Sequence, residues 1–294
     1  MSRRGWLLFA SLGLIWGVPY LFIKIAVEQV SPAVMVFGRV LLAAIALLPL
    51  AASRGMLRSL LPHWHWVVLF AVVEMGVPFA LLGYAEQRIS SSLAGLLVAA
   101  VPLIGAVLAR LLRLDDRLDP LRLLGLLVGI AGVAALVGLD VRGDLLSVAA
   151  VGVTATGYAI GPILVSTRLA GLPGIGVTAV AFALNAVVFA PFAWRTRPTH
   201  AVDLQVWVAI ALLGLLCSAV AFLIFFPLVA EVGPARATVI TYVNPAIAVT
   251  LGVAVRGEPI TTGLLVGFPL VLLGSFLATR RSATRVRPQA PAPV

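Results

Sequence analysis

The sequence contains few charged residues: they make up 11% of the 294 positions, whereas hydrophobic residues make up 62%. A soluble domain carries about 25% charged residues. Apolar runs of about twenty residues, the length that a helix needs to cross a hydrocarbon core roughly 30 Å thick, recur from Gly5 almost to the C-terminus. These features exclude an ordinary water-soluble fold and predict a chain that lies almost wholly in the lipid bilayer.

Cysteine and lysine are almost absent. Cys217 is the single cysteine, which excludes an internal disulfide and a cysteine-based metal site. Lys24 is the single lysine, yet the formal charge is +10. In a soluble protein that charge would suggest nucleic acid as a partner. Here the basic residues are spread over short loops and the C-terminal tail, a distribution that fixes orientation in a membrane. We therefore expect the lipid bilayer and a small molecule as partners, and no nucleic acid.

Motifs of common enzymes are missing as well. HExxH, GxSxG and P-loop motifs do not occur, so neither an intramembrane protease nor an ATP-driven pump is indicated, and no cofactor is expected. Asp115, Asp116 and Asp119 have the D-D-x-x-D spacing with which prenyl-transferring enzymes bind Mg²⁺ and a diphosphate. Because the motif occurs once and Pro120 would break the helix behind it, we interpret it as a charged cytoplasmic turn. A Mg²⁺-dependent membrane prenyl transferase stays as the alternative from another class.

Breaking the apolar runs at proline, glycine and charge clusters predicts ten membrane spans. If the N-terminus lies inside, most of the basic residues fall on the cytoplasmic side. This excess predicts a multi-pass protein of the inner membrane with both termini in the cytoplasm. The predicted spans cover residues 5–27, 33–52, 66–85, 92–112, 120–139, 145–167, 175–194, 205–228, 235–255 and 261–279.

The chain compares with itself across a short linker at 140–144. In that comparison Ser91–Pro102 lies over Pro234–Pro245, which places a proline in the middle of both helices. Matched prolines inside spans are informative because proline removes a helix hydrogen bond. Transporters are commonly built from inverted repeats, and five spans in each half make the two halves enter from opposite faces. After a one-residue slip, further matches lay Asp116 over Glu258, Gly125 over Gly267, and Gly132 over Gly274.

We therefore predict an all-α membrane protein with ten transmembrane helices arranged as two inverted five-helix repeats. The first repeat covers 1–139 and the second covers 145–279. Residues 280–294, which contain four arginines and several prolines, are expected to form a disordered basic cytoplasmic tail.

These marks resemble the EamA-type domain of the drug/metabolite transporter superfamily, which consists of two five-helix repeats. The marks are Trp16-Gly17 followed by Lys24, then Arg39, Pro102, Pro245 and Gly257-Glu258. The chain departs from the family pattern at Asp115-Asp116, where Gly-Glu is usual, and at Val180, where Arg39 would recur. The resemblance implies transport without naming a substrate. We expect a secondary transporter, not an enzyme, that exports small metabolites such as amino acids by alternating access between the two halves. Multidrug efflux is the alternative within transport.

Ionisable residues inside spans are candidates for function because they are costly in a bilayer. Glu74 lies about eight residues, or roughly 12 Å, into the third span, and it is the only acidic residue deep within any predicted span. It is therefore the candidate for proton coupling. Arg39 lies roughly 9 Å below the outer surface, so a buried Arg39–Glu74 ion pair that only holds helices together is an open alternative. Lys24 and Arg39 are also near enough to that surface to snorkel.

Aromatic and amide side chains complete the candidate binding site. Trp16 and Tyr20 share one helix face, and Tyr242 and Asn244 form a polar notch beside the carbonyl freed by Pro245. Core packing or an interfacial belt is the alternative for most single aromatics. The substrate-binding candidates are Trp16, Tyr20, Lys24, Arg39, Glu74, Tyr84, Tyr158, Asn185, Tyr242 and Asn244. The GxxxG pairs Gly13–Gly17, Gly125–Gly129 and Gly263–Gly267 predict close helix packing, either inside the scaffold or at a homodimer face.

Overall fold

The computed structural model describes residues 2–112, 120–140, 144–232 and 240–279. Within these ranges every regular element is a helix and no strand occurs. In the part of the chain that the structure describes, nine helical segments are long and apolar enough to cross a membrane. A tenth apolar helix, α14 (Ile240–Arg256), is shorter and starts directly after residues 233–239, which lie outside the described ranges. The predicted all-helical membrane fold is confirmed, and the helix ends fall within a few residues of the predicted spans.

The first five spans include two that are interrupted at prolines. Pro19 starts a new helix after Gly17, and Pro102 lies in the first turn of the helix that follows a break at 99–100. A proline has no N–H to donate and its ring crowds the preceding turn, so the chain restarts there. The spans are α1 (Arg3–Gly17) with α2 (Pro19–Val27), α3 (Pro32–Ser53), η1 (Arg58–His63) with α4 (Trp64–Phe70), η2 (Ala71–Gly76) and α5 (Val77–Glu86), α6 (Ser91–Val98) with α7 (Val101–Leu111), and α8 (Pro120–Asp140).

The second five spans follow the same order. They are α9 (Leu145–Thr167), α10 (Gly174–Arg195), α11 (Leu204–Gly214) with η3 (Leu215–Val220) and α12 (Ala221–Val232), α14, and α15 (Thr262–Thr279). The third span of each half contains a six-residue π-helical turn, η2 and η3. Glu74 is the fourth residue of η2, and Ser218 is the fourth residue of η3. Such turns are rare and occur frequently at functional sites, so their matched positions support the two-repeat organisation.

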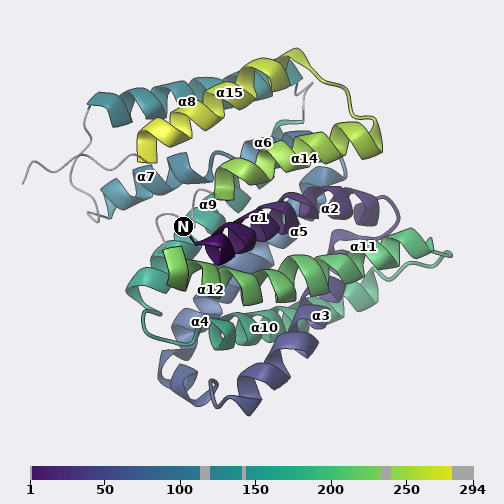
Figure 1. Cartoon of the computed structure of the whole chain (residues 1–294). Coiled ribbons are helices and arrows are strands. Elements are labelled where there is room, and N and C mark those ends of the chain that lie inside the picture. Colours follow the sequence, from purple (N-terminus) through teal and green to yellow (C-terminus); the bar gives the residue numbers. More distant parts are fainter. Residues whose placement is uncertain (1, 113–119, 141–143, 233–239, 280–294) are drawn as a thin grey trace, which may run out of the picture.

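Helices α8 and α15 lie side by side along one edge of the bundle (Figure 1). Their glycines face each other: a Cβ on Gly132 would lie 2.6 Å from the Val271 nitrogen, and one on Gly267 would lie 2.8 Å from the Gly132 oxygen. Only glycine allows two backbones to approach so closely. The glycines at 125, 129 and 267 therefore pack inside the chain. For these glycines the sequence left open either a contact inside the scaffold or a homodimer face, and the structure shows the contact inside the scaffold.

The GxxxG pair in α1 also packs inside the chain. A Cβ on Gly13 would lie 3.2 Å from Val243, and one on Gly17 would lie 3.2 Å from the Asn244 oxygen, both in α14. Helix α1 of the first half is thereby held against α14 of the second half. The glycines thus bring together helices from the two repeats, with the polar residues of the middle spans between them.

Candidate functional site

Arg39 is buried in the middle of α3, with 6% of its surface exposed. Its Nε donates a hydrogen bond to Ser218 Oγ at 3.0 Å, and its guanidinium carbon lies 3.7 Å from the centroid of the Phe79 ring. Ser218, in the π-turn η3, in turn donates to the Leu213 oxygen of the preceding helix α11 at 2.8 Å. Arginine carries five N–H donors, and the terminal nitrogens of Arg39 make no hydrogen bond with the residues that the structure describes. These donors remain for a ligand.

Glu74 projects from η2 toward α9. A Cβ on Gly161 would lie 2.6 Å from the Glu74 carboxyl carbon, so only glycine at that position leaves room for the carboxyl group. Its Oε2 is buried and accepts no hydrogen bond from any described residue. The carboxyl group therefore faces the bundle interior, as expected for an ionisable group in a span.

The Arg39–Glu74 ion pair that the sequence left open is not formed. Arg39 contacts Ser218 and Phe79, and Glu74 has no hydrogen-bonded partner at Oε2. The two residues lie on different helices, and no salt bridge or hydrogen bond joins them. The interpretation of these two charges as one structural pair is therefore wrong.

Two tyrosines connect the surroundings of these charges. Arg39 interacts electrostatically with Tyr20 of α2 and Tyr158 of α9, and Tyr158 also interacts with Glu74. The electrostatic fields of a buried cation and of a buried carboxyl group therefore both act on Tyr158. We call Tyr20, Arg39, Glu74 and Tyr158 the central cluster. It combines donors for an anion with an acceptor for a cation in a setting largely removed from water.

Lys24 does not snorkel to the surface. Its Nζ donates to the backbone oxygens of Glu86 at 2.6 Å and of Ile89 at 3.0 Å. The lysine therefore caps the C-terminal end of α5, where carbonyl groups lack helical partners. This contact joins α2 to the turn between α5 and α6.

Glu86 was missed by sequence reasoning. It is the last residue of α5 and is 0% exposed, and neither carboxyl oxygen accepts a hydrogen bond from the described residues. The predicted third span ends one residue earlier, and Gln87 and Arg88 made the position resemble a loop. The only signal in the sequence was the position of Glu86 next to the predicted end of the span. Whether a residue at that end is buried depends on how α2 and α6 cover it.

Three of the candidate aromatics lie outside the central cluster. The Trp16 ring centroid lies 5.9 Å from that of Phe222 and 5.2 Å from that of Phe225, so α1 meets α12 in an aromatic cluster. Tyr84 stacks under the Arg88 guanidinium, whose central carbon is 4.2 Å from the ring centroid. The Tyr242 hydroxyl is 2.8 Å from the Thr279 hydroxyl. Contacts with other protein groups therefore account for these side chains.

Both candidate asparagines bind backbone carbonyls. Asn185 Nδ2 donates to the Ala71 oxygen in η2 and to the Ala181 oxygen, each at 2.9 Å. Asn244, with its amide oriented so that its nitrogen meets acceptors, donates to the oxygens of Ile240 at 3.0 Å and Gly13 at 3.2 Å. Asn185 thus supports the π-turn that carries Glu74, and Asn244 fills the polar notch of α14 by a bond to α1.

Glu258 lies in the turn between α14 and α15 and crosses to the other half of the chain. Its carboxylate accepts hydrogen bonds from the Ser91 nitrogen at 2.9 Å, the Ser91 hydroxyl at 2.8 Å, the Ser92 nitrogen at 2.9 Å and the Ser92 hydroxyl. Partial burial acts to raise the pKa of Glu258, but the bonds from Ser92 and Ser91 outweigh it and hold that pKa below its ordinary value. An ionised Glu258 therefore caps α6, where free N–H groups favour negative charge.

Several such polar contacts join the two halves at the end of the bundle opposite the N-terminus. Arg256 forms a salt bridge with Glu28. The Gln29 side chain exchanges two hydrogen bonds with Asp203, at 2.6 and 2.9 Å. The hydroxyls of Ser31 and Thr196 are 2.6 Å apart. Together with the Glu258 cap of α6, these contacts form what we call the far-end clamp: Glu28, Gln29, Ser31, Ser91, Ser92, Thr196, Asp203, Arg256 and Glu258.

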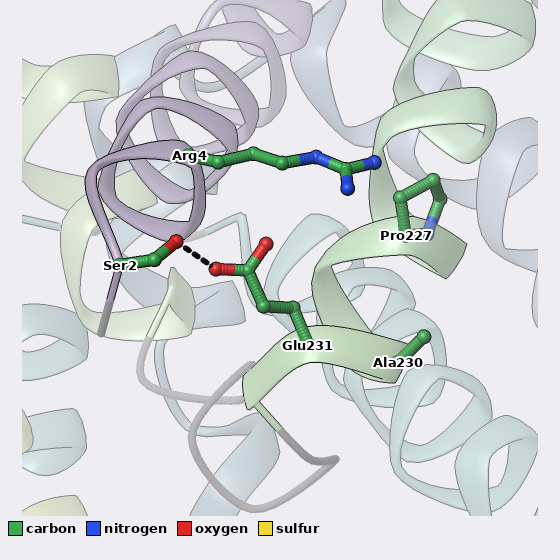
Figure 2. Close-up of a pocket in the computed structure, with 5 residues that line it drawn as sticks. All are labelled: Ser2, Arg4, Pro227, Ala230 and Glu231. Carbon is green, nitrogen blue, oxygen red and sulfur yellow. Dashed lines mark hydrogen bonds between the residues drawn. The ribbon is translucent and has the colours of Figure 1, made fainter.

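The N-terminal end of the bundle is hollowed between α1 and α12. The pocket there has a volume of about 520 Å³, and Figure 2 shows the residues that line it, Ser2, Arg4, Pro227, Ala230 and Glu231. The Ser2 hydroxyl donates to the Glu231 carboxylate across the mouth of the pocket. Among the described residues, this bond joins the halves at the N-terminal end, whereas the far-end clamp joins them through several polar contacts.

The described residues offer no group of three or more His, Cys, Asp or Glu that could hold a metal ion. Asp115, Asp116 and Asp119, which have the spacing of a Mg²⁺-binding motif, lie outside the described ranges.

Comparison with known proteins places this geometry in a family context. The model of the EamA-like transporter family matches residues 3–138 and again residues 145–280. The chain is 30% identical to the uncharacterized inner membrane transporter YedA of Escherichia coli over 282 residues, which cover 92% of this chain and 90% of that protein. It is 26% identical to a protein named a probable terminal-alkyne amino-acid exporter from Streptantibioticus cattleyicolor, over 98% of this chain and 97% of that protein.

A solved crystal structure has a similar fold, with a TM-score of 0.67 and 21% identity over 95% of this chain and 97% of that one. At that identity the likeness shows the fold alone. The repeated family match agrees with the two five-helix repeats predicted from the matched prolines and glycines.

Proposed function

The chain belongs to the EamA-like transporter family, and from that premise we propose that it exports amino acids or related small zwitterions across the inner membrane by alternating access. It is a transporter and not an enzyme, since the matched relatives are named as transporters. The substrate class is our proposal. The observation that carries it is the free guanidinium of Arg39 together with the separate, buried carboxyl group of Glu74, whose Oε2 accepts no hydrogen bond from the described residues.

The two groups suit the two ends of an amino acid. The free guanidinium donors of Arg39 can hold a carboxylate, the group that arginine binds best. The carboxyl group of Glu74 can accept from an ammonium, and Tyr158 interacts with both residues. A substrate bearing only a positive charge would leave Arg39 buried without an anion, which is costly. The cluster therefore favours zwitterionic metabolites over the cationic drugs typical of multidrug efflux.

Alternating access is supported by the concentration of polar contacts between the halves at one end. The far-end clamp joins the halves through Arg256–Glu28, Gln29–Asp203, Ser31–Thr196 and Glu258, whereas the Ser2–Glu231 bond joins them at the N-terminal end. In the proposed orientation, with both termini in the cytoplasm, this conformation is closed to the outside. Export then requires the clamp to open and the N-terminal end to close.

We further propose that Glu74 exchanges a proton for the substrate ammonium, which would couple export to the proton gradient. A buried carboxyl group changes its protonation when a neighbouring cation arrives or leaves.

A homodimer stays a separate hypothesis, because the glycines that motivated it in α1, α8 and α15 contact other helices of the same chain.

Counterflow in proteoliposomes tests the substrate class. Vesicles containing the purified chain and unlabelled L-leucine should accumulate labelled L-leucine, whereas labelled isopentylamine, which lacks the carboxylate, should not accumulate. Arg39→Gln should reduce leucine counterflow at least tenfold, while Tyr242→Phe, a change outside the central cluster, should leave it near the wild-type rate. Equal counterflow of the amine and the amino acid, or transport of ethidium alone, would contradict the proposal and favour drug efflux.

A further inference from the structure

Glu86 is the most completely buried acidic side chain among the described residues that has no partner. Its exposed fraction is 0%, and both carboxyl oxygens lack a hydrogen bond. The adjacent ammonium of Lys24 donates to the backbone oxygens of Glu86 and Ile89 and not to the carboxyl group. An ionised carboxylate without hydrogen bonds is very costly at such a site. In this conformation Glu86 therefore carries a proton.

The titratable groups around Glu86 come from four packed segments. Lys24 and Tyr20 face it from α2, Arg39 from α3, Tyr158 from α9, and Glu258 from the turn after α14. The cations favour an ionised Glu86, whereas the ionised Glu258 opposes it because like charges repel. Glu86 thus interacts electrostatically with the central cluster through Arg39 and Tyr158, and with the far-end clamp through Glu258.

The chain also links Glu86 to the clamp mechanically. The turn 87–90 connects it to Ser91 and Ser92, whose N–H and hydroxyl groups hold Glu258. When Glu258 leaves the start of α6, the turn that follows Glu86 is no longer held at Ser91 and Ser92, and the nearby negative charge departs. Water can then reach the carboxyl group, and Lys24 is close enough to become its counter-ion.

Given the alternating access proposed above, we propose that Glu86 is a second proton-binding site, which keeps its proton while the far-end clamp is closed and loses it when the clamp opens. In the step, the O–H bond of the carboxyl group breaks, the proton passes to water on the far side, and the carboxylate is left beside the Lys24 ammonium. The ligand is a proton and not Na⁺, because Lys24 Nζ already occupies the backbone oxygens that would bind a metal cation. Glu86 thereby ties protonation to the opening of the clamp.

Infrared spectroscopy of the purified full-length protein tests this directly through the carbonyl band of protonated carboxyl groups. At neutral pH the wild type should show such a band. Part of the band should persist in Glu74→Gln, and Glu86→Gln should remove that part. Glu231→Gln, which changes an exposed carboxylate at the opposite end, should leave the band intact. In Glu258→Gln, which weakens the clamp, the Glu86 band should disappear at a lower pH than in the wild type. An unchanged band in Glu86→Gln would overturn the proposal.

Stability supplies a second readout. Because glutamine has the shape and neutrality of a protonated glutamate, Glu86→Gln should fold and melt within a few degrees of the wild type. If Glu86 were instead ionised and paired with Lys24, Glu86→Gln would be strongly destabilised and adding Lys24→Met would restore the melting temperature, which would overturn the proposal. Neither measurement needs transport, so loss of leucine counterflow in the wild type would refute the proposed substrate while the Glu86 site still stood.

Discussion

Replacing Glu258 by glutamine should open the far-end clamp. The Glu258 carboxylate accepts four hydrogen bonds from Ser91 and Ser92, whereas a glutamine offers one oxygen and turns an NH₂ group toward N–H and O–H donors. Hydrogen bonds to a charged group contribute about 1.5–3 kcal/mol each when well buried, and the charge at a helix N-terminus adds about 0.3–1 kcal/mol. Because Glu258 is only about half buried, we take about 2 kcal/mol as the net loss to the closed state.

A loss of about 2 kcal/mol corresponds to a roughly thirtyfold shift from the closed toward the open conformation. The chain suits a cysteine-labelling assay, because Cys217 is its single cysteine and can be replaced by alanine. In that background, Ile89→Cys places a thiol at a buried far-end position. An impermeant maleimide added outside should label it up to about thirty times faster with Glu258→Gln than without.

The acid dependence of labelling follows from the lowered pKa of Glu258 in the closed state. A carboxyl group whose pKa is lowered by closure stabilises the closed state above its ordinary pKa of about 4.3. That contribution is lost as the pH falls through the lowered value. This titration of Glu258 should therefore increase labelling of Ile89→Cys in acid, and the increase should be missing in Glu258→Gln. Equal labelling rates for the two proteins at neutral pH would refute the clamp, and Glu231→Gln serves as the control at the opposite end.

Three further outcomes are expected. Glu74→Gln should abolish stimulation of export by a pH gradient while counterflow exchange stays measurable in the same vesicles, and retained stimulation would remove Glu74 from coupling. Gly274→Leu should lower stability by about 2 kcal/mol or more, because its side chain would meet the backbone of α8, whereas Gly138→Leu, with open space around it, should leave the melting temperature nearly unchanged. Reporter fusions after Arg58 should read cytoplasmic and those after Arg142 periplasmic, and the reverse pattern would overturn the proposed orientation.

Much of the architecture could be predicted from the sequence because it depends on local properties. The length of an apolar run determines whether a helix can cross the bilayer, so spans such as α3 and α9 match the predicted ranges within a residue. Matched prolines and glycines indicated the two repeats, since both residue types constrain the backbone wherever they occur. Glu74 could likewise be singled out by its depth alone, because depth follows from position along a helix.

The partners of the polar residues were decided by the tertiary structure. Arg39 binds Ser218 across 179 positions of the chain, and no local pattern distinguishes that serine from others in apolar runs. Glu86 is buried because Lys24 and the start of α6 close over the end of α5, whereas its neighbours Gln87 and Arg88 suggested an exposed loop. The glycines of α8 allowed either a scaffold contact or a dimer face until α15 was seen to cover them. Apolar length and backbone chemistry act within one helix and can be read from sequence, but which side chain meets which depends on how separate helices pack.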